Sequence, residues 1–246
     1  MYPDHKQTFT LSDLHVDCFG RLKPSTILFF AQEIASQHCE LLRLDWDSLS
    51  EKNLFWAVTR HRVQITRLPV RGETITVETW PMPTTKVAFP RSVVAYDQQG
   101  NELFRAISIW VLMDSKTRAM ILPGKSGVLV EGTLRGTELA APRSLVPCPL
   151  QNTCSRTVDY TLLDRNRHMN NTRYLDWLDG LLPSAFHQSH PLREMTVCYH
   201  NEALENQKID LSWNLSDGPV LQVDAHRENT NVPGATDRVF SAKLEY

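Results

Sequence analysis

The sequence lacks the features that mark several large classes of protein. Its 28 acidic residues nearly balance its 26 basic ones, giving a formal net charge of −2, so no bulk positive charge favours nucleic acid or anionic membranes. No apolar run approaches the roughly 18–20 residues that a membrane span requires, and the polar N-terminus lacks the apolar core of a signal peptide. With 41% hydrophobic residues, the chain is expected to be a globular cytoplasmic protein.

Common catalytic and metal-binding motifs are also missing from the sequence. The five cysteines are scattered and form no Cys-x-x-Cys pair, which favours reduced thiols and gives no zinc signature. The nine histidines lack the paired spacing of metal ligands. There is no Gly-x-Ser-x-Gly motif, so a serine hydrolase of that type is not expected. We therefore predict neither a metal nor a bound cofactor.

What the sequence does contain is a weak internal repeat. Residues 15–30 align without gaps with residues 162–177 at an offset of 147, which places Asp17 on Asp164. Identities are few, but apolar and small residues also coincide. Self-similarity of this kind is typical of a chain built from two copies of one unit.

A second, looser sequence similarity, or echo, relates residues 61–80 to residues 194–213. Both segments end on tryptophan, Trp80 and Trp213. The two matches occur in the same order and at similar spacing. Together they predict two structural units, which we place at 1–140 and 154–246 with a linker at 141–153. The glycines and prolines between 124 and 152 support a linker there.

Each copy has the same order of predicted elements. A polar turn leads into a helix that begins near Pro24 in the first copy and near Asn170, Asn171 or Thr172 in the second. Strands with alternating apolar residues are expected afterwards, at 54–66, 73–80, 86–96, 102–113, 117–122, 194–203, 207–215, 219–227 and 236–245. One long helix wrapped by an antiparallel sheet, repeated twice, is an α+β arrangement.

The turn before the second helix carries an unusual set of polar residues. Asp164, Asn166 and His168 alternate, so in an extended segment all three would point to one side. A helix start adds backbone N–H groups that favour negative charge, and such a site could hold a carbonyl as it becomes an oxyanion. The same residue types also build ordinary turns and helix caps, so capping and catalysis both remain open.

The first copy provides an internal comparison for this turn. Its matching positions are Asp17, Phe19 and Arg21, so the asparagine and the histidine are missing. The looser echo also places Pro69 where the second copy has Glu202. We therefore expect one copy to carry the chemistry and the other to keep only the fold.

The residues from Leu163 to Asn171, followed by Tyr174 and Trp177, resemble the signature of acyl-acyl-carrier-protein thioesterases of the plant and bacterial type. The first copy follows that family's amino-half pattern at a further set of positions: Trp56, Arg60, Val63, Ile65, Arg67, Pro69, Gly72, Glu73 and Thr79 to Pro81. The resemblance covers roughly residues 5–245. It implies a tandem, or double, hotdog fold, and the bacterial form because no plastid-targeting segment precedes the fold.

The resemblance implies hydrolysis of a fatty acyl thioester on the phosphopantetheine of acyl carrier protein, a reaction of fatty acid biosynthesis. Asn166 and His168 would lie in the catalytic run with Asp164 orienting them, and Glu202 would be the carboxylate on the next strand. Asn166 and the helix start would hold the carbonyl while Glu202, with or without His168, activates a water. Attack by Glu202 itself stays an alternative. Some members carry a cysteine after that glutamate, but Ala203 excludes such a thiol here.

Substrate contacts are expected from Asn170, Asn171, Trp56 and Trp80, although tryptophans are equally ordinary core residues. An acidic carrier protein could dock on the arginines that flank the motif at 165, 167 and 173, or on those between 60 and 71. A monomer and a homodimer are both compatible with the sequence. The alternatives on the same fold are an acyl-CoA thioesterase or a dehydratase, and a third possibility is a non-catalytic acyl-binding protein.

Overall fold

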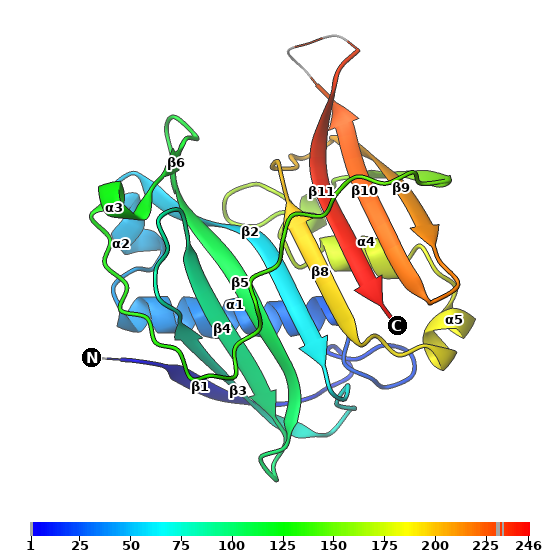
Figure 1. Cartoon of the computed structure of the whole chain (residues 1–246), viewed down its shortest axis with the longest axis horizontal. Helices are drawn as coiled ribbons and strands as arrows, with labels where there is room; N and C mark the ends of the chain where they lie inside the picture. The colour runs from blue at the N-terminus through cyan, green and yellow to red at the C-terminus, as the bar shows by residue number, and fades with distance from the viewer. Residues whose placement is uncertain (1, 230–231, 233) are drawn as a thin grey trace. The chain divides into compact units, whose positions relative to one another are not determined.

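The computed structural model describes residues 2–229, 232 and 234–246, and the chain divides into two compact units, Met1–Pro142 and Arg143–Tyr246. Each unit contains an antiparallel sheet and its own helices, as the ribbon in Figure 1 shows. Among the described residues, no helix combines the length and the apolarity needed to cross a membrane.

The first unit is built on five long strands in the order β1-β3-β4-β5-β2, all antiparallel, with the short β6 added to β5. The strands are β1 (His5–Thr10), β2 (Leu54–Ile65), β3 (Thr74–Pro81), β4 (Phe89–Tyr96), β5 (Glu102–Asp114) and β6 (Met120–Ile121). The helices are α1 (Pro24–Leu41), α2 (Trp46–Ser50) and α3 (Pro123–Ser126). Helix α1 runs across one face of this sheet and contacts β1 and β3 (Figure 1).

Helix α1 forms where the sequence predicts it, with Pro24 in its first turn. Its buried stripe includes Ile27, Ile34 and His38, which recur at helical spacing and face the sheet. Leu41, which continues this stripe in the sequence, is 42% exposed because the helix ends there. The apolar stripe therefore explains why α1 packs on the sheet along most of its length.

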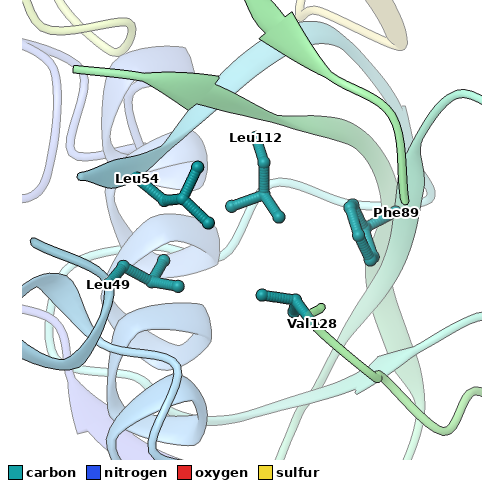
Figure 2. Close-up of a cluster of buried hydrophobic side chains, with 5 residues drawn as sticks. All are labelled: Leu49, Leu54, Phe89, Leu112 and Val128. Carbon is teal, nitrogen blue, oxygen red and sulfur yellow. The ribbon is translucent and has the colours of Figure 1, made fainter. Parts of the chain in front are cut away.

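Five buried apolar side chains form a cluster in the first unit (Figure 2). Its members come from α2, from three strands or strand ends, and from the irregular chain after α3: Leu49, Leu54, Phe89, Leu112 and Val128. Val128 is 4% exposed although its neighbours in sequence have no regular secondary structure. The glycine- and proline-rich stretch after α3 thus contributes to the core of the first unit.

Arginine side chains also tie this stretch to the two units. Arg135 pairs with Glu78 and Asp4, and its guanidinium lies 4.2 Å from the ring centroid of Trp80. In the second unit, Arg238 donates to the carbonyl oxygen of Leu145 at 3.2 Å. These contacts fix the backbone of a segment that forms no helix or strand between 127 and 151.

The second unit has five antiparallel strands in the order β8-β11-β10-β9-β7. They are β7 (Asn152–Thr157), β8 (Glu194–Tyr199), β9 (Lys208–Leu215), β10 (Val220–Glu228) and β11 (Thr236–Glu245). A 3₁₀ turn, η1 (Tyr160–Leu162), precedes the helices α4 (Tyr174–Asp179) and α5 (Ser184–Ser189). Tyr174 packs α4 against the sheet, with ring centroids 5.3 Å from Tyr199 on β8 and 4.8 Å from Phe240 on β11.

The α+β arrangement agrees with the sequence prediction, but the second helix differs from it. Helix α4 has six residues rather than the long helix expected, and it ends at Asp179 with Gly180 as its C-cap. Leu181 already lies beyond its end. Glycine and, three residues later, Pro183 both disfavour continued helix, which explains the early stop.

Candidate active site

The residues from Leu163 to Met169 form a closed turn. Leu163 and Met169 make an isolated antiparallel bridge, and the Asp164 N–H donates to the carbonyl oxygen of His168 at 2.8 Å. The Arg167 N–H donates to the carbonyl oxygen of Asp164 at 2.9 Å, and Arg167 has a φ of +62°. The expectation of an extended segment with alternating side chains is therefore wrong, because the backbone folds back on itself here.

The carboxylate of Asp164 lies at the centre of this turn. Its Oδ1 accepts the backbone N–H groups of Asn166 at 2.8 Å and of His168 at 3.2 Å. Its Oδ2 lies 3.5 Å from the side-chain nitrogen of Asn166. These bonds hold the backbone of both predicted catalytic residues through one anion, which is an Asx-type turn.

Glu202 lies opposite His168. The Nε2 of His168 is 3.3 Å from Oε2 of Glu202, with side-chain exposures of 15% and 40%. The backbone brings them together, because the Met169 N–H donates to the carbonyl of Ala203 at 2.8 Å and His168 bridges to Leu204. The structure thus joins a histidine and a carboxylate that are 34 positions apart in the sequence, at a place that water can reach.

Two tyrosines pack beneath the turn. The hydroxyl of Tyr199 donates to the carbonyl of Asn171 at 2.7 Å, which fixes the backbone after the motif. Burial raises the pKa of Tyr174 and of Tyr199 far above the ordinary tyrosine value, and the nearby Asp164 and Glu202 add to the effect on Tyr174. Both phenol groups are therefore neutral, and the two rings support the turn by packing against it.

The first unit contains the same turn at an offset of 147 residues. Asp17 accepts the N–H groups of Phe19 at 2.8 Å and of Arg21 at 2.9 Å, and its own N–H donates to the Arg21 carbonyl at 2.7 Å. Gly20, at a φ of +76°, takes the place of Arg167. The weak repeat in the sequence therefore corresponds to a repeat in backbone geometry.

The equivalent of Glu202 is not the residue that the sequence echo indicates. The Leu22 N–H donates to the carbonyl of Pro69, just as the Met169 N–H donates to that of Ala203. These matching hydrogen bonds align Pro69 with Ala203 and Leu68 with Glu202. The structural offset between the two loops is therefore 134, whereas the sequence echo used 133. The placing of Pro69 opposite Glu202 is therefore wrong by one residue.

The same shift applies to the pairing of Trp80 with Trp213. Strand β1 pairs Thr10 with Thr74 in the first unit, and β7 pairs Thr157 with Lys208 in the second. With Thr74 on Lys208, Trp213 corresponds to Thr79. In the corrected register Leu68 stands where Glu202 does, so the first unit has neither the carboxylate, the histidine nor the asparagine.

Asn170 and Asn171, the predicted substrate contacts beside the turn, make bonds within the protein. The side-chain oxygen of Asn170 accepts the N–H of Thr172 at 2.9 Å and its hydroxyl at 2.8 Å. The carbonyl of Asn171 accepts from Tyr199. Helix α4 begins only at Tyr174, after Arg173 as an N-cap without a side-chain cap bond. A short helix that starts this late contributes little dipole to the turn.

Trp56 and Trp80 both lie in the first unit. Trp80 is 1% exposed, and its indole N–H is 3.4 Å from Glu138. Trp56 is partly buried against the cluster of Figure 2, where it meets Phe89 edge-on at 5.0 Å and donates to the carbonyl of Leu44 at 2.9 Å. These contacts are those of core residues, and an acyl contact by either tryptophan remains a prediction.

One residue near Glu202 has no signal in the sequence. Arg227, at the end of β10, donates to the carbonyl oxygen of Glu202 and to the side chain of Gln207. It is 25 positions away from Glu202 and belongs to no recognisable motif. Only the sheet topology brings it beside the loop that carries the carboxylate.

Comparison with known families matches both units. The acyl-ACP thioesterase N-terminal domain matches residues 3–122, and the acyl-ACP thioesterase C-terminal domain matches residues 151–236. The chain belongs to the acyl-ACP thioesterase family. The resemblance read from the sequence is thereby confirmed, and the C-terminal match includes the turn and Glu202.

Curated relatives of this thioesterase-family chain include proteins from plants. A chloroplastic palmitoyl-acyl carrier protein thioesterase of Gossypium hirsutum is 26% identical over 226 residues, covering 86% of this chain and 55% of its own length. A chloroplastic dodecanoyl-[acyl-carrier-protein] hydrolase of Cinnamomum camphora is 23% identical, covering 87% of this chain and 60% of its own. The chain therefore spans little more than half the length of these relatives.

Solved structures of similar fold cover the chain almost completely. An acyl-ACP thioesterase from Bacteroides thetaiotaomicron superposes with a TM-score of 0.85 at 20% identity, covering 99% of this chain and 97% of its own. A 12:0-ACP thioesterase from Umbellularia californica gives a TM-score of 0.83 at 22% identity, covering 100% and 97%. The predicted α+β double hotdog fold is confirmed by these likenesses.

Proposed function

We propose that this chain hydrolyses the thioester between a fatty acyl group and acyl carrier protein, releasing a free fatty acid and the holo carrier. The observation that carries the proposal is the pairing of His168 with Glu202 at 3.3 Å beside Asn166, in the unit that matches the thioesterase C-terminal domain. Membership of the family supports the substrate class, and the names of the plant relatives support a carrier-bound acyl chain.

The proposed reaction uses water and no covalent intermediate. The side-chain amide of Asn166 donates to the thioester carbonyl, and Glu202 accepts a proton from a water that attacks the carbonyl carbon. The resulting oxyanion collapses, the carbon–sulfur bond breaks, and the sulfur takes up the proton that Glu202 removed. His168, in contact with Glu202, orients the carboxylate and can relay that proton. Direct attack by Glu202 is the alternative route.

Asp164 acts in this scheme as a positioning residue. Its carboxylate holds the N–H groups of Asn166 and His168, so both side chains leave a fixed backbone. Asp17 makes the same bonds in the first unit, where Phe19 and Arg21 replace the polar pair. We therefore assign the chemistry to the second unit and propose that the first, with Trp56 and Trp80, contributes to holding the acyl chain.

For the acidic carrier protein we propose docking on the exposed arginines of the catalytic turn. Arg165 and Arg167 flank Asn166, and Arg173 follows the motif and lies 3.4 Å from Asp176. The first-unit arginines are less suited, because Arg67 already pairs with Glu73. Replacing Arg165 with Gln and Arg167 with Asn should raise KM for the carrier-bound substrate several-fold at low salt and leave kcat unchanged.

The test is release of free thiol from a series of acyl carrier protein and acyl-CoA substrates of different chain length, with Glu202→Ala alongside. Hydrolysis of carrier-bound chains that collapses in the variant is the expected result. Turnover with CoA substrates alone would replace the proposal with an acyl-CoA thioesterase. An unsaturated product would indicate a dehydratase, and bound acyl chains without turnover would indicate an acyl-binding protein.

We propose the cytoplasm as the location and fatty acid biosynthesis as the process. All five cysteines are free in the structure, which suits a reducing compartment. Cell fractionation tests the location. Measurement of the native mass would distinguish a monomer from a homodimer.

A further inference from the structure

Glu202 lies in a loop after β8, and an arginine from another strand forms hydrogen bonds to that loop. Arg227, near the end of β10, donates to the backbone carbonyl oxygen of Glu202 itself. The same Nη1 donates to Oε1 of Gln207 at 2.8 Å, and Nη2 lies 3.5 Å from Oδ2 of Asp237 on β11. The Arg227 side chain is 18% exposed.

Gln207 connects Arg227 by hydrogen bonds to the middle of the loop. Its Oε1, which accepts from Arg227, also accepts the N–H of Leu204 at 2.9 Å. Its backbone N–H donates to the carbonyl of Leu204 at 3.1 Å, which closes a turn over 204–207. Leu204 is the residue that bridges to His168. One guanidinium therefore restrains the backbone on both sides of Ala203, at the point where the loop meets the catalytic turn.

We propose that Arg227 is a positioning residue for the Glu202 carboxylate, an inference that rests on the proposed thioester hydrolysis. Glu202 follows the last residue of β8 by three positions, so no strand pairing fixes its own backbone. Anchoring its carbonyl to β10 sets the direction in which its side chain leaves the chain and keeps Oε2 against His168. Displacement of a reacting group by about 1 Å can reduce a rate by roughly 100-fold.

The first unit offers a matched comparison. Glu73, at the position of Gln207, accepts the N–H of Val70 at 3.1 Å just as Gln207 accepts that of Leu204. Its cationic partner is Arg67, which follows β2 and binds both carboxylate oxygens at 2.8 and 2.9 Å. An arginine thus closes the loop in both units, Arg67 from the residues after β2 and Arg227 from β10, and the first unit has Leu68 where the second has Glu202.

The experiment compares Arg227→Met with Arg67→Met in the full chain, using one acyl carrier protein substrate of the preferred chain length. Arg227→Met should lower kcat about 10- to 100-fold while KM changes less than about two-fold, because the carboxylate is misplaced and the substrate contacts are kept. Arg67→Met should keep the wild-type kcat. Arg227→Lys, which keeps one donor and the charge, should recover part of the rate. Thermal unfolding of each variant checks that it is folded.

A double variant shows whether Arg227 acts through Glu202. In a Glu202→Ala background, adding Arg227→Met should lower the single-turnover rate no further, since the group it positions is gone. Wild-type kcat in a folded Arg227→Met protein, or an equal additional loss in the Glu202→Ala background, would overturn the inference while the proposed function stands. Absence of hydrolysis by the wild type, or full activity of Glu202→Ala alone, would instead contradict the proposed function.

Discussion

Asp164 and Asp17 stabilise the same turn in the two units, and the residues beside them differ. Asp164 and Asp17 each accept two backbone N–H groups across a tight turn. In the second unit the turn presents Asn166 and His168, whereas in the first it presents Phe19. The capping and catalytic interpretations of the motif are therefore compatible, with Asp164 holding the turn and its neighbours as the proposed reacting groups.

A pair of matched variants separates these two contributions. Asp164→Ala and Asp17→Ala each remove a carboxylate that accepts two backbone N–H groups, so each should lower the free energy of unfolding by about 1–3 kcal/mol. Only Asp164→Ala should also lower kcat for acyl carrier protein substrates, by at least about ten-fold. Urea unfolding and steady-state kinetics measure the two effects. Equal activity losses in both variants would contradict the assignment of Asp164 to the catalytic turn.

At the residue scale, local pattern predicts part of the site and long-range contact supplies the rest. The turn residues stand close together in the sequence, so their grouping is visible in one segment. The geometry of the turn is not, because its closure depends on bonds between Asp164 and His168. Arg227 has no local signal at all, since β10 reaches the Glu202 loop only through the sheet.

At the scale of elements, alternation of apolar residues predicts the central strands well. The strands that it misses are the edge strands β1 and β7, each of six residues with few apolar side chains. Each pairs with only one long neighbour, β3 or β9, so pairing rather than burial stabilises it. Strand β7 begins at Asn152, inside the segment predicted as linker.

Packing of the irregular chain after α3 can be tested with two adjacent residues. Val128 is 4% exposed in the cluster of Figure 2, whereas Leu129 is 91% exposed. Val128→Ala should cost about 1–3 kcal/mol of unfolding free energy through lost burial and a residual cavity, and Leu129→Ala should cost almost nothing. Chemical denaturation measures both. Equal stability of the two variants would mean that this segment is not part of the core.

A buried histidine in β2 should make stability depend on pH. Burial lowers the pKa of His61 to about 3, against an ordinary value near 6.5 in the unfolded chain. Well above pH 6.5 His61 is neutral in both states and does not change the free energy of unfolding. As the pH falls from 6.5 towards 3, the free energy of unfolding decreases, because only the unfolded state takes up the proton easily. At pH 5.5 this amounts to about 1.4 kcal/mol of unfolding free energy.

Replacing His61 with Gln removes that proton-binding group. The difference in unfolding free energy between pH 7.5 and pH 5.5 should shrink by about 1.4 kcal/mol in the variant. His38, whose pKa is also lowered by burial, should leave a residual pH dependence. Urea unfolding at the two pH values provides the measurement, and an unchanged difference would show that His61 is protonated in the folded chain.

At the scale of the whole molecule, a single architectural unit occurs twice with different content. The turns correspond at an offset of 147, but the loops after the next strand correspond at 134, because the second unit has a shorter helical segment. The gapless echo at an offset of 133 misplaced Glu202 by one residue, because so few identities do not fix the register of the two segments. The duplicated fold was predictable from the sequence, while the register of its parts required backbone hydrogen bonds.

The proposed thioester hydrolysis depends on one carboxylate of the second unit, Glu202. It is tested most directly by the single-turnover rate of fatty acid release from acyl carrier protein for wild type, Glu202→Gln and Glu205→Gln. Glu205 is an exposed carboxylate of the same loop, so its variant controls for loss of charge there. We expect a loss of about 100- to 10,000-fold for Glu202→Gln and a wild-type rate for Glu205→Gln. A Glu202→Gln protein that releases fatty acid at the wild-type rate would contradict it.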